Sequence, residues 1–321
     1  MTVRLPAEWE PQQAVWFVWP RDPLTWPDRL SEAREAIAHA VRAVAPQEVR
    51  LVVHPDLEED ARKALAGASH VRYFPCVHQD SWIRDYGPIT VQTAEGPRAL
   101  KFRFDAWGGK YESLMADDAV VDRLGEAAIG CPVEPIDFVL EGGAIDTDGE
   151  GTFLVTRSVA RERGQTTPEL EHVLRHHLGA RRIVWLPGGV EGDDTDGHID
   201  TVARFVAPNR VIASRAPEGH PDHASLEANR NALLDHGFDV IDLPVPRQVT
   251  TDDGTVLPAG HANFLITNDV VLVPAYDGPS DDDAARIIAE ATGRRVVLVD
   301  HTALIWGFGG IHCLSMQVPQ Q

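Results

Sequence analysis

DDTDGHIDTVARFV, residues 193–206, holds an acidic turn followed at once by a run of apolar and aromatic side chains. Asp and Gly are typical turn residues, because an Asp side chain bonds nearby backbone groups and Gly tolerates positive φ angles. The run from His198 to Val206 is rich in β-branched and aromatic residues, which predicts a strand. In such a strand His198 and Asp200 are two positions apart and point to the same face, so a base and an acid would stand side by side.

Runs of the same kind recur along the whole chain and alternate with helical patterns. The other strand-like runs are AVWFVW (14–19), VRLVVH (49–54), PITVQT (88–93), RIVWL (182–186), NFLITN (263–268), VVLVP (270–274) and RVVLV (295–299). Apolar residues at helical spacing, with Pro or Asp near the first turn, predict helices over 28–44, 168–178 and 281–291. No linker or low-complexity stretch separates these elements. We therefore expect one domain over residues 1–321, of class α/β or α+β.

Polar residues follow the strand-like runs at nearly regular intervals. Asp85, Glu141, Asp200, Asn263 and Cys313 are separated by 56, 59, 63 and 50 residues. Repeated supersecondary units produce such periods, although the well-known repeats are shorter, at about 20 to 50 residues. Five units could close into a ring, each supplying one side chain to a central site. The alternative, that the regularity arises by chance, stays open at this point.

The composition is that of a folded, acidic protein. Of 321 residues, 43% are hydrophobic and 24% are charged, which excludes a disordered, collagen-like or coiled-coil chain. The 29 Lys and Arg against 49 Asp and Glu give a net charge of −20. This charge repels nucleic acids and anionic membranes and favours a cationic small molecule. Strong acidity can equally reflect solubility or a saline habitat.

Cysteine usage and the N-terminus point to a reducing compartment. No run approaches the roughly 18 apolar residues of a membrane span, and MTVRLPAEWE lacks the apolar core of a secretory signal, so we expect a cytoplasmic protein. Cys76, Cys131 and Cys313 are widely spaced, which argues against a disulfide framework and against a zinc site. We expect Cys76 and Cys131 to be small buried hydrophobes. A homodimer is an alternative to a monomer.

Cys313 stands in the glycine-rich segment WGFGGIHC, residues 306–313. Glycines let the backbone approach a ligand closely, so a thiol here would be presented to a substrate. His312 is adjacent, but neighbouring residues of a strand face opposite ways. The base that serves the thiol would then come from elsewhere in the fold, and His198 is the best candidate.

The acidic turn does not match a calcium-binding loop. In an EF-hand register it would put Gly192 at the first position and Ala203 at the twelfth, where Asp and Glu are required. For Asp193 and Asp196 we expect a structural role instead, in which their side chains cap backbone N–H groups. We expect no metal and no cofactor.

Phosphate and histidine-metal sites are disfavoured as well. EGG (141–143) and PGGVEG (187–192) match neither the P-loop nor the dinucleotide-binding pattern, and nearby carboxylates would repel phosphate. Two histidine pairs are expected to be exposed rather than metal ligands: His176/His177 and His220/His223.

Six motifs in fixed order carry a resemblance to a known family. They are PAEWEPQQAVWFVWP, DSWIRDYGPI, FDAWGGKY, LEGGAIDTDGEGT, EGDDTDGHIDTVARF and GGIHC. Nearly end to end, the chain resembles the agmatine deiminase and bacterial, Porphyromonas-type peptidylarginine deiminase family of the guanidino-group-modifying superfamily. The resemblance implies a single α/β domain, a pseudo-fivefold β/α propeller (pentein fold) of about five ββαβ-type modules. It also implies cofactor-free hydrolysis of a guanidinium.

The resemblance further implies roles for individual residues. Cys313 matches the nucleophile, His198 the general acid/base, and Glu141 a carboxylate that orients the histidine, while Asp85 and Asp200 match the guanidinium-binding carboxylates. Two carboxylates suit a guanidinium, because it is planar, permanently charged and presents a fork of donors. A thiolate can attack its carbon, ammonia leaves, and water then releases a ureido product from the thiouronium. We expect the positive charges of the histidine and the substrate to favour the thiolate.

Three further residues are assigned to substrate binding: Trp82, Asn263 and Gly310. Trp82 would stack on the substrate cation, or equally belong to the core. The chain departs from the usual family pattern at Ala144, where Ser or Asn is common, and at Phe308 and Gly310, where Gly and Asn are frequent. These changes spare the nucleophile and leave the pocket for the far end of the substrate open.

The expected reaction converts agmatine and water to N-carbamoylputrescine and ammonia, a step toward putrescine. A first alternative is an arginine or peptidylarginine deiminase, for which Arg103 would bind a substrate carboxylate unless it is an ordinary surface residue. An amidinotransferase would differ only in the acceptor of the thiouronium. A guanidine- or polyamine-binding protein without turnover is a third alternative, but it would not need the thiol.

Overall fold

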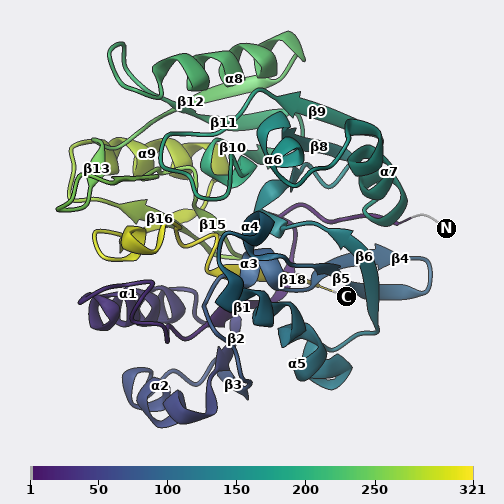
Figure 1. Cartoon of the computed structure of the whole chain (residues 1–321), viewed down its shortest axis with the longest axis vertical. Helices are drawn as coiled ribbons and strands as arrows, with labels where there is room; N and C mark the ends of the chain where they lie inside the picture. The colour runs from purple at the N-terminus through teal and green to yellow at the C-terminus, as the bar shows by residue number, and fades with distance from the viewer. Residues whose placement is uncertain (1–2, 321) are drawn as a thin grey trace.

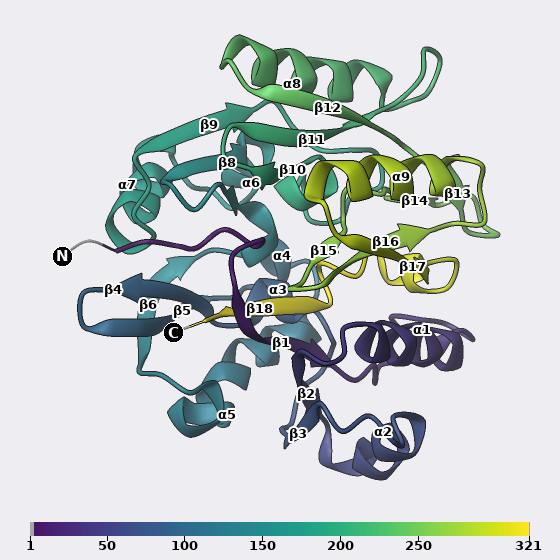
Figure 2. The ribbon, with the colours of Figure 1, turned by 180° about the vertical axis from the view of Figure 1, so that it is seen from behind.

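The computed structural model describes residues 3–320, which form small sheets with helices around them (Figure 1). One sheet joins the two ends of the described chain. Its strands are β18 (Ser315–Pro319), β1 (Gln12–Val18), β2 (Glu48–Val53) and β3 (Val71–Pro75), in that order. β18 is antiparallel to β1, and the remaining neighbours are parallel. Both views place the β18–β1 pair near the middle of the molecule (Figures 1 and 2).

Four three-stranded sheets within residues 3–320 share one connectivity. Two consecutive strands pair antiparallel, and a helical crossover leads to a third strand that is parallel to the second. The crossover is needed because parallel neighbours must start at the same edge of the sheet. These sheets are β4 (Ile89–Thr93), β5 (Gly96–Arg103) and β6 (Val133–Val139); β7 (Asp146–Thr147), β8 (Thr152–Thr156) and β9 (Arg182–Leu186); β10 (Ala203–Ala207), β11 (Arg210–Arg215) and β12 (Asp239–Pro244); and β15 (Leu265–Ile266), β16 (Val270–Ala275) and β17 (Arg295–Asp300). A ribbon of β13 (Val249–Thr250) and β14 (Val256–Leu257) is separate from them.

Five of the longer helices lie at the periphery and, followed along the chain, α1, α5, α7, α8 and α9 succeed one another around it, whereas the short α3 and α4 lie near the middle (Figure 1). The α-helices are α1 (Leu30–Ala43), α2 (Glu58–Ala64), α3 (Ile83–Tyr86), α4 (Ala106–Gly109), α5 (Val120–Ile129), α6 (Arg157–Glu162), α7 (Thr167–His177), α8 (His223–Asp235) and α9 (Ser280–Thr292). Short 3₁₀ turns are η1 (Pro55–Leu57), η2 (Glu112–Ala119), η3 (Gly142–Ala144), η4 (Ile199–Thr201) and η5 (Leu304–Gly307). Among the helices of the described part, none has the length and apolar content needed to cross a bilayer.

Local sequence explains where the outer helices begin and which face they bury. α7 starts with a capping box, in which the side chains of Thr166 and Glu169 each accept a backbone N–H of the other. α9 carries three aspartates in its first turn, which the helix dipole favours. α1 buries Ile37 and Val41, four residues apart on one face, and both belong to the same hydrophobic cluster as the fully buried strand residues Phe17 and Leu51. Each helix thus covers a sheet that would otherwise expose apolar residues.

The α/β class is confirmed, as are most of the expected elements. The helices expected over 28–44, 168–178 and 281–291 are α1, α7 and α9. The runs at 14–19, 49–54, 88–93, 182–186, 270–274 and 295–299 are strands to within two residues at each end. The intrinsic β-strand propensity of these residues predicts the strands correctly, because their apolar runs are long and the surrounding elements bury them.

Two strand predictions are wrong in part. The run from His198 to Val206 becomes a strand only at Ala203, because η4 occupies Ile199–Thr201. The hydroxyl of Thr201 donates to the carbonyl oxygen of His198 at 2.8 Å and stabilises this turn. His198 and Asp200 therefore do not share a strand face. In the run 263–268, only Leu265–Ile266 is a strand.

Candidate active site

Five segments next to the sheets bring their polar side chains together. Asp85 lies in α3, Glu141 before η3, Asp200 in η4, Asn263 before β15 and Cys313 before β18, and each is at most 5% exposed. Sγ of Cys313 lies 3.6 Å from Oδ2 of Asp200 and 3.1 Å from Nδ2 of Asn263. Because these residues flank five different sheets, the site exists only when the sheets have assembled.

A cavity of about 610 Å³ opens beside Cys313 and Asp85, a size usual for small-molecule sites. Trp82, Trp107 and Trp306 form aromatic parts of its wall. Its charged lining is acidic, and among the described lining residues there is neither Lys nor Arg. The carboxylates that line it belong to Asp22, Asp80, Asp85, Asp194, Asp252 and Asp253.

His198 lies between two carboxylates. Its Nδ1 is 3.7 Å from Oδ1 of Asp85 and its Nε2 is 3.9 Å from Oε2 of Glu141. These distances are too long for hydrogen bonds, and within residues 3–320 neither ring nitrogen has a hydrogen-bond partner. Burial opposes the charged form, but the charges of Asp85 and Glu141 outweigh it and raise the pKa of His198 to about 9. At neutral pH His198 is therefore a protonated imidazole, and neither of its N–H groups donates a hydrogen bond to another residue within 3–320.

Asp85 is held by two donors and has an elevated pKa. Nε1 of Trp107 donates to its Oδ2 at 3.0 Å, and the amide of Gly143 donates to its Oδ1 at 3.2 Å. Burial raises the pKa of Asp85 to about 6, although the positive charge of His198 acts against it. Gly143 is required here, because a Cβ would lie 2.5 Å from Nδ1 of His198 and 3.0 Å from Oδ1 of Asp85.

Asp200 is ionised and keeps one oxygen free. Burial favours its neutral form, but the hydrogen bond and the charge of His312 outweigh burial and lower the pKa of Asp200. Nδ1 of His312 is 2.7 Å from Oδ2 of Asp200. Oδ1 of Asp200 is buried without a hydrogen-bond partner among residues 3–320, so it is available to a ligand.

Burial raises the pKa of the Cys313 thiol well above its ordinary value, and the charges of Asp200 and Asp85 raise it further. The histidine by itself therefore does not produce a thiolate, contrary to one part of the expectation from sequence. A cation placed between the carboxylates would remove the repulsion that disfavours the thiolate.

Asn263 fixes the segment that carries the nucleophile. Its Oδ1 accepts the backbone N–H of His312 at 3.0 Å and that of Cys313 at 3.3 Å. Gly310 makes room for this contact, because a Cβ there would lie 2.5 Å from Oδ1 of Asn263. The strand predicted over 263–268 therefore begins only at Leu265, since Asn263 bonds the nucleophile segment instead of joining a ladder.

Glu141 is paired on its far side with Arg163. Nε of Arg163 donates to Oε1 of Glu141 at 2.7 Å, and both side chains are 1% exposed. Burial alone would raise the pKa of Glu141, but His198 and Arg163 lower it to about 2. Glu141 is therefore a permanent anion beside the histidine.

The acidic turn is structural, as expected for Asp193, whose carboxylate accepts the N–H groups of Thr195 and Gly197, each at 2.9 Å. Asp196 does not cap the backbone. It pairs instead with Lys110 and Arg163, each at 2.7 Å, because both cations reach it from neighbouring segments. Within residues 3–320, no group of three or more His, Cys, Asp or Glu side chains is arranged to hold a metal ion.

The side chain of Trp82 belongs to the hydrophobic core and also lines the cavity. It is 5% exposed, and its Nε1 donates to Oδ2 of Asp80 at 2.8 Å. Gly309 lies against the ring, where a Cβ would come within 2.4 Å. Burial raises the pKa of Asp80 to about 7.

Arg103 does not reach the cavity. Its side chain extends from β5 with 62% exposure and pairs with Asp137 at 3.1 Å. The interpretation of Arg103 as a surface strand residue is confirmed, and its candidacy for a substrate carboxylate is wrong. Cys76 and Cys131 were expected to be buried and the two histidine pairs to be exposed. Cys76 is buried and His176 is exposed, as expected. The remaining residues are half-buried: Cys131, His177, His220 and His223.

Six further residues contact the predicted site residues or one another, and none of the six was assigned a role from sequence. They are Glu8, Arg84, Trp107, Arg163, Arg204 and His312. Five of them stand inside the six motifs, where charged residues between apolar neighbours were a usable signal of buried pairing. Arg163 lies outside the motifs, and nothing in its local sequence indicates its role.

Comparisons with known proteins match almost the whole chain. The Porphyromonas-type peptidyl-arginine deiminase family matches residues 4–319. An agmatine deiminase of Stutzerimonas stutzeri is 32% identical over 350 residues, which cover 98% of this chain and 95% of the relative. The structure of a C. jejuni agmatine deiminase variant with substrate bound superposes with a TM-score of 0.92 at 28% identity, covering 99% of this chain and 96% of the other.

A more distant likeness concerns the fold alone. A dimethylarginine dimethylaminohydrolase superposes with a TM-score of 0.58 at 17% identity, covering 95% of this chain and 99% of the other. The full-length match and the convergence of the motif residues at one cavity lead to the same conclusion. This chain belongs to the Porphyromonas-type peptidyl-arginine deiminase family.

Proposed function

We propose that this protein hydrolyses agmatine to N-carbamoylputrescine and ammonia. One observation carries the proposal: the thiol of Cys313, the carboxylates of Asp85 and Asp200 and the protonated His198 meet beside a cavity whose charged lining is acidic. The names of the relatives, agmatine deiminases among them, support the same reaction.

The two carboxylates hold the guanidinium. Charge-assisted pairs between carboxylates and a planar guanidinium are strong and fix its orientation. Oδ1 of Asp200 has no other partner among the described residues, and Asp85 borders the cavity. We assign Trp82 to stacking on this cation. At the far end, a primary ammonium suits the acidic lining, whereas a carboxylate would be repelled there.

Substrate binding itself promotes formation of the thiolate. Burial, and in addition the charges of Asp200 and Asp85, hold the pKa of Cys313 above its ordinary value in the free protein. A guanidinium bound between them offsets their charge, so the thiol loses its proton more readily. Nδ2 of Asn263, 3.1 Å from Sγ, donates to the thiolate and stabilises it.

The thiolate attacks the guanidinium carbon and forms a tetrahedral adduct. His198 donates a proton to one terminal nitrogen, the bond from carbon to that nitrogen breaks, and ammonia leaves a thiouronium bound to Sγ. The neutral imidazole then takes a proton from water, whose oxygen attacks the same carbon. The C–S bond breaks, Sγ leaves with its electron pair and takes up the hydroxyl proton of the adduct, and the neutral ureido product is released with Cys313 again a thiol.

Glu141 supports both roles of His198. An anion near its Nε2 favours the imidazolium before ammonia leaves. Arg163 keeps Glu141 in place and ionised. The pair therefore sets the proton affinity of the acid/base without contacting the substrate.

We also assign the whole chain to one domain with pseudo-fivefold symmetry, in which the sheets form five modules around the site. Four sheets repeat the same connectivity, and β18 supplies the antiparallel partner that completes the pattern for β1 and β2. The cyclic order of the outer helices supports this arrangement (Figure 1). A small cationic substrate would then reach the site from the open end of the cavity.

The test compares guanidino substrates by kcat/KM, with ammonia and ureido product both measured. Agmatine is expected to be the best substrate, and arginine at least about a hundredfold worse, because its carboxylate loses hydration among anions. Equal or faster hydrolysis of arginine or of arginyl peptides would contradict the assignment of agmatine as substrate but would still support deiminase chemistry. Binding of agmatine without any product would overturn the reaction.

A further inference from the structure

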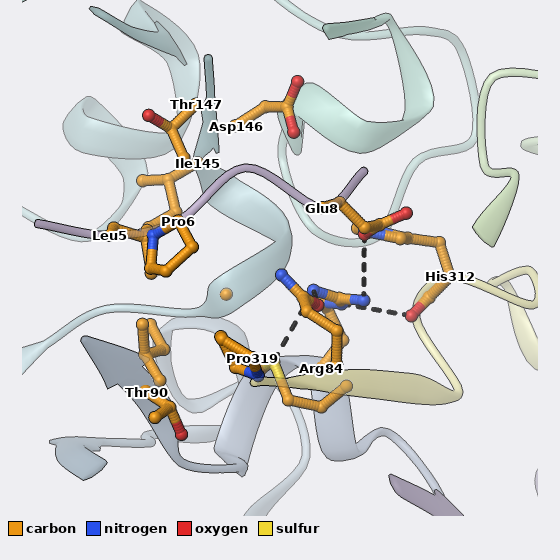
Figure 3. A pocket seen from close by; sticks show the side chains of 14 residues that line it. Leu5, Pro6, Glu8, Arg84, Thr90, Ile145, Asp146, Thr147, His312 and Pro319 are labelled. Atoms are coloured by element: carbon orange, nitrogen blue, oxygen red, sulfur yellow. Dashed lines mark hydrogen bonds and ion pairs between the residues drawn. The ribbon is translucent and has the colours of Figure 1, made fainter. Parts of the chain in front are cut away.

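The buried histidine next to the nucleophile has partners on both sides. His312 is 2% exposed, and its Nδ1 and Nε2 lie 2.7 Å from Oδ2 of Asp200 and 2.8 Å from Oε2 of Glu8. Glu8 comes from the N-terminal segment, which passes close to Arg84 and His312 at one side of a small hollow (Figure 3). The three residues of the bridge are 304 and 112 positions apart in sequence.

Both carboxylates are anions, so the ring must donate from both nitrogens. The pKa values of Glu8 and of Asp200 are lowered despite burial, through the charges of Arg204 and His312 at Glu8 and through the bond from His312 at Asp200. A neutral imidazole has one donor and one acceptor, and an acceptor nitrogen 2.8 Å from a carboxylate would be repelled. Both ring nitrogens of His312 are therefore assigned as donors, one to each carboxylate.

Glu8 is itself held firmly. Its Oε2 lies 3.0 Å from Arg204 and 3.5 Å from Arg84, and its Oε1 accepts the amide of Ile266 at 2.7 Å. Arg204 also pairs with Asp146 at 3.3 Å. The anions Glu8, Asp146 and Asp200 thus balance the cations Arg84, Arg204 and His312, which is how so many charges are tolerated in the interior.

We infer that His312 is a positioning residue: braced by Glu8, it orients the carboxylate of Asp200 so that Oδ2 is occupied and Oδ1 faces the guanidinium. This inference rests on the proposed function of the same site. The positioning role follows from the hydrogen bonds of Asp200: its Oδ2 accepts the hydrogen bond from His312, whereas its Oδ1 has no partner among residues 3–320. The charge on His312 also offsets Asp200 beside Sγ of Cys313, 3.6 Å from Oδ2.

Two substitutions separate orientation of Asp200 from a merely structural role. The amide nitrogen of Asn can occupy the place of Nδ1, and that of Gln, one bond longer, the place of Nε2. His312→Asn therefore keeps the donor to Asp200, whereas His312→Gln keeps only the donor to Glu8. Both remove the charge, so a difference between them reports orientation. His78→Gln is the matched control, because His78 is fully buried but its Nδ1 lies 3.0 Å from the carbonyl of Cys76.

The measurement is alkylation of Cys313 by 2-chloroacetamidine, a cationic amidine, divided by alkylation by its neutral isostere chloroacetamide. The ratio reports recognition of a planar cation without requiring turnover. We expect His312→Gln to lower the ratio about 10- to 100-fold, as for loss of a hydrogen bond to a charged group. His312→Asn should stay within about threefold of wild type, and His78→Gln should keep the wild-type ratio.

Equal ratios in the Asn and Gln variants of His312 would overturn the inference, because a structural role depends on the charge and not on which nitrogen remains. If His312→Gln does not fold, Glu8→Gln is tested instead. This variant removes the carboxylate that holds Nε2 of His312, so the alkylation ratio should fall at least about threefold. An unchanged ratio would overturn the inference. The kcat/KM for agmatine should follow the same order. Selective alkylation of a wild-type protein that never hydrolyses agmatine would refute the proposed function and leave the positioning role intact.

Discussion

Asp85→Asn should make the protein more stable and far less active at once. Asp85 is buried and has a pKa of about 6, against an ordinary value of 3.8. Between these values the native state binds more protons than the unfolded state, so stability falls as pH rises from about 4 to 6 and the full penalty persists above pH 6. At about 1.36 kcal/mol per unit of pKa, the penalty at neutral pH is about 3 kcal/mol. Asn carries no charge and escapes it.

Part of this gain is offset by lost hydrogen bonding. Trp107 and Gly143 donate to different oxygens of Asp85, and Asn has one oxygen only. One unsatisfied donor costs about 1 kcal/mol. The net stabilisation should therefore be about 1 to 2 kcal/mol at pH 8, and it should disappear near pH 4, where Asp85 of the wild type is protonated.

The activity should change in the opposite direction. We proposed that Asp85 is one of two desolvated carboxylates that bind the guanidinium; its removal should then cost about 3 to 5 kcal/mol, or about 10²- to 10⁴-fold in kcat/KM. Urea denaturation at pH 8 and pH 4 and an ammonia assay measure both effects. Asp137→Asn is the control, since Asp137 is 91% exposed. A variant that is less stable than wild type at pH 8, or that retains a tenth of the activity, would refute this reasoning.

The other predictions concern the nucleophile, the buried pair and the histidine. Cys313→Ala should keep the fold and lose ammonia release by several orders of magnitude, whereas Cys76→Ala stays active; comparable activity in both variants would remove the covalent mechanism. Arg163→Met should lower the free energy of unfolding by about 3 to 5 kcal/mol, because it leaves Glu141 charged and buried without its partner; a urea midpoint equal to that of wild type would contradict this. His198 has a pKa of about 9 against 6.5 in the unfolded chain, so its contribution to stability is complete below pH 6.5 and is lost as pH rises through 9. His198→Gln should flatten that decline in denaturation curves, and an unchanged slope would show that another group causes it.

The elements whose burial is dictated by their own composition were predictable. The strands at 14–19 and 270–274 are continuous apolar runs, and such runs are buried in almost any context. The recurrence of Asp85, Glu141, Asp200, Asn263 and Cys313 after successive strands also lies in the sequence alone, and these residues do converge. Family membership likewise rests on local motifs, because their order and residue types survive without any knowledge of contacts.

Contacts between distant segments were decided only by the tertiary structure. His198 and Asp200 were predicted on one strand face, but η4 turns the chain there through a hydrogen bond from Thr201. Arg103 was a candidate for the substrate and is a surface residue, since β5 directs it toward Asp137. Neither outcome can be read from spacing, because each depends on which groups satisfy the backbone and the charges nearby.

The charge states of the site belong to the folded molecule as well. By sequence alone His198 is an ordinary histidine, Asp85 an ordinary acid and Cys313 an ordinary thiol. Burial raises the pKa of Asp85 and of the Cys313 thiol, whereas the pKa of His198 is raised against burial by the charges of Asp85 and Glu141. The same holds for the bridge from Glu8 through His312 to Asp200, which joins three segments that are remote along the chain. A sequence specifies which charges are present, but the strength of each interaction depends on the distance and the exclusion of water that packing creates.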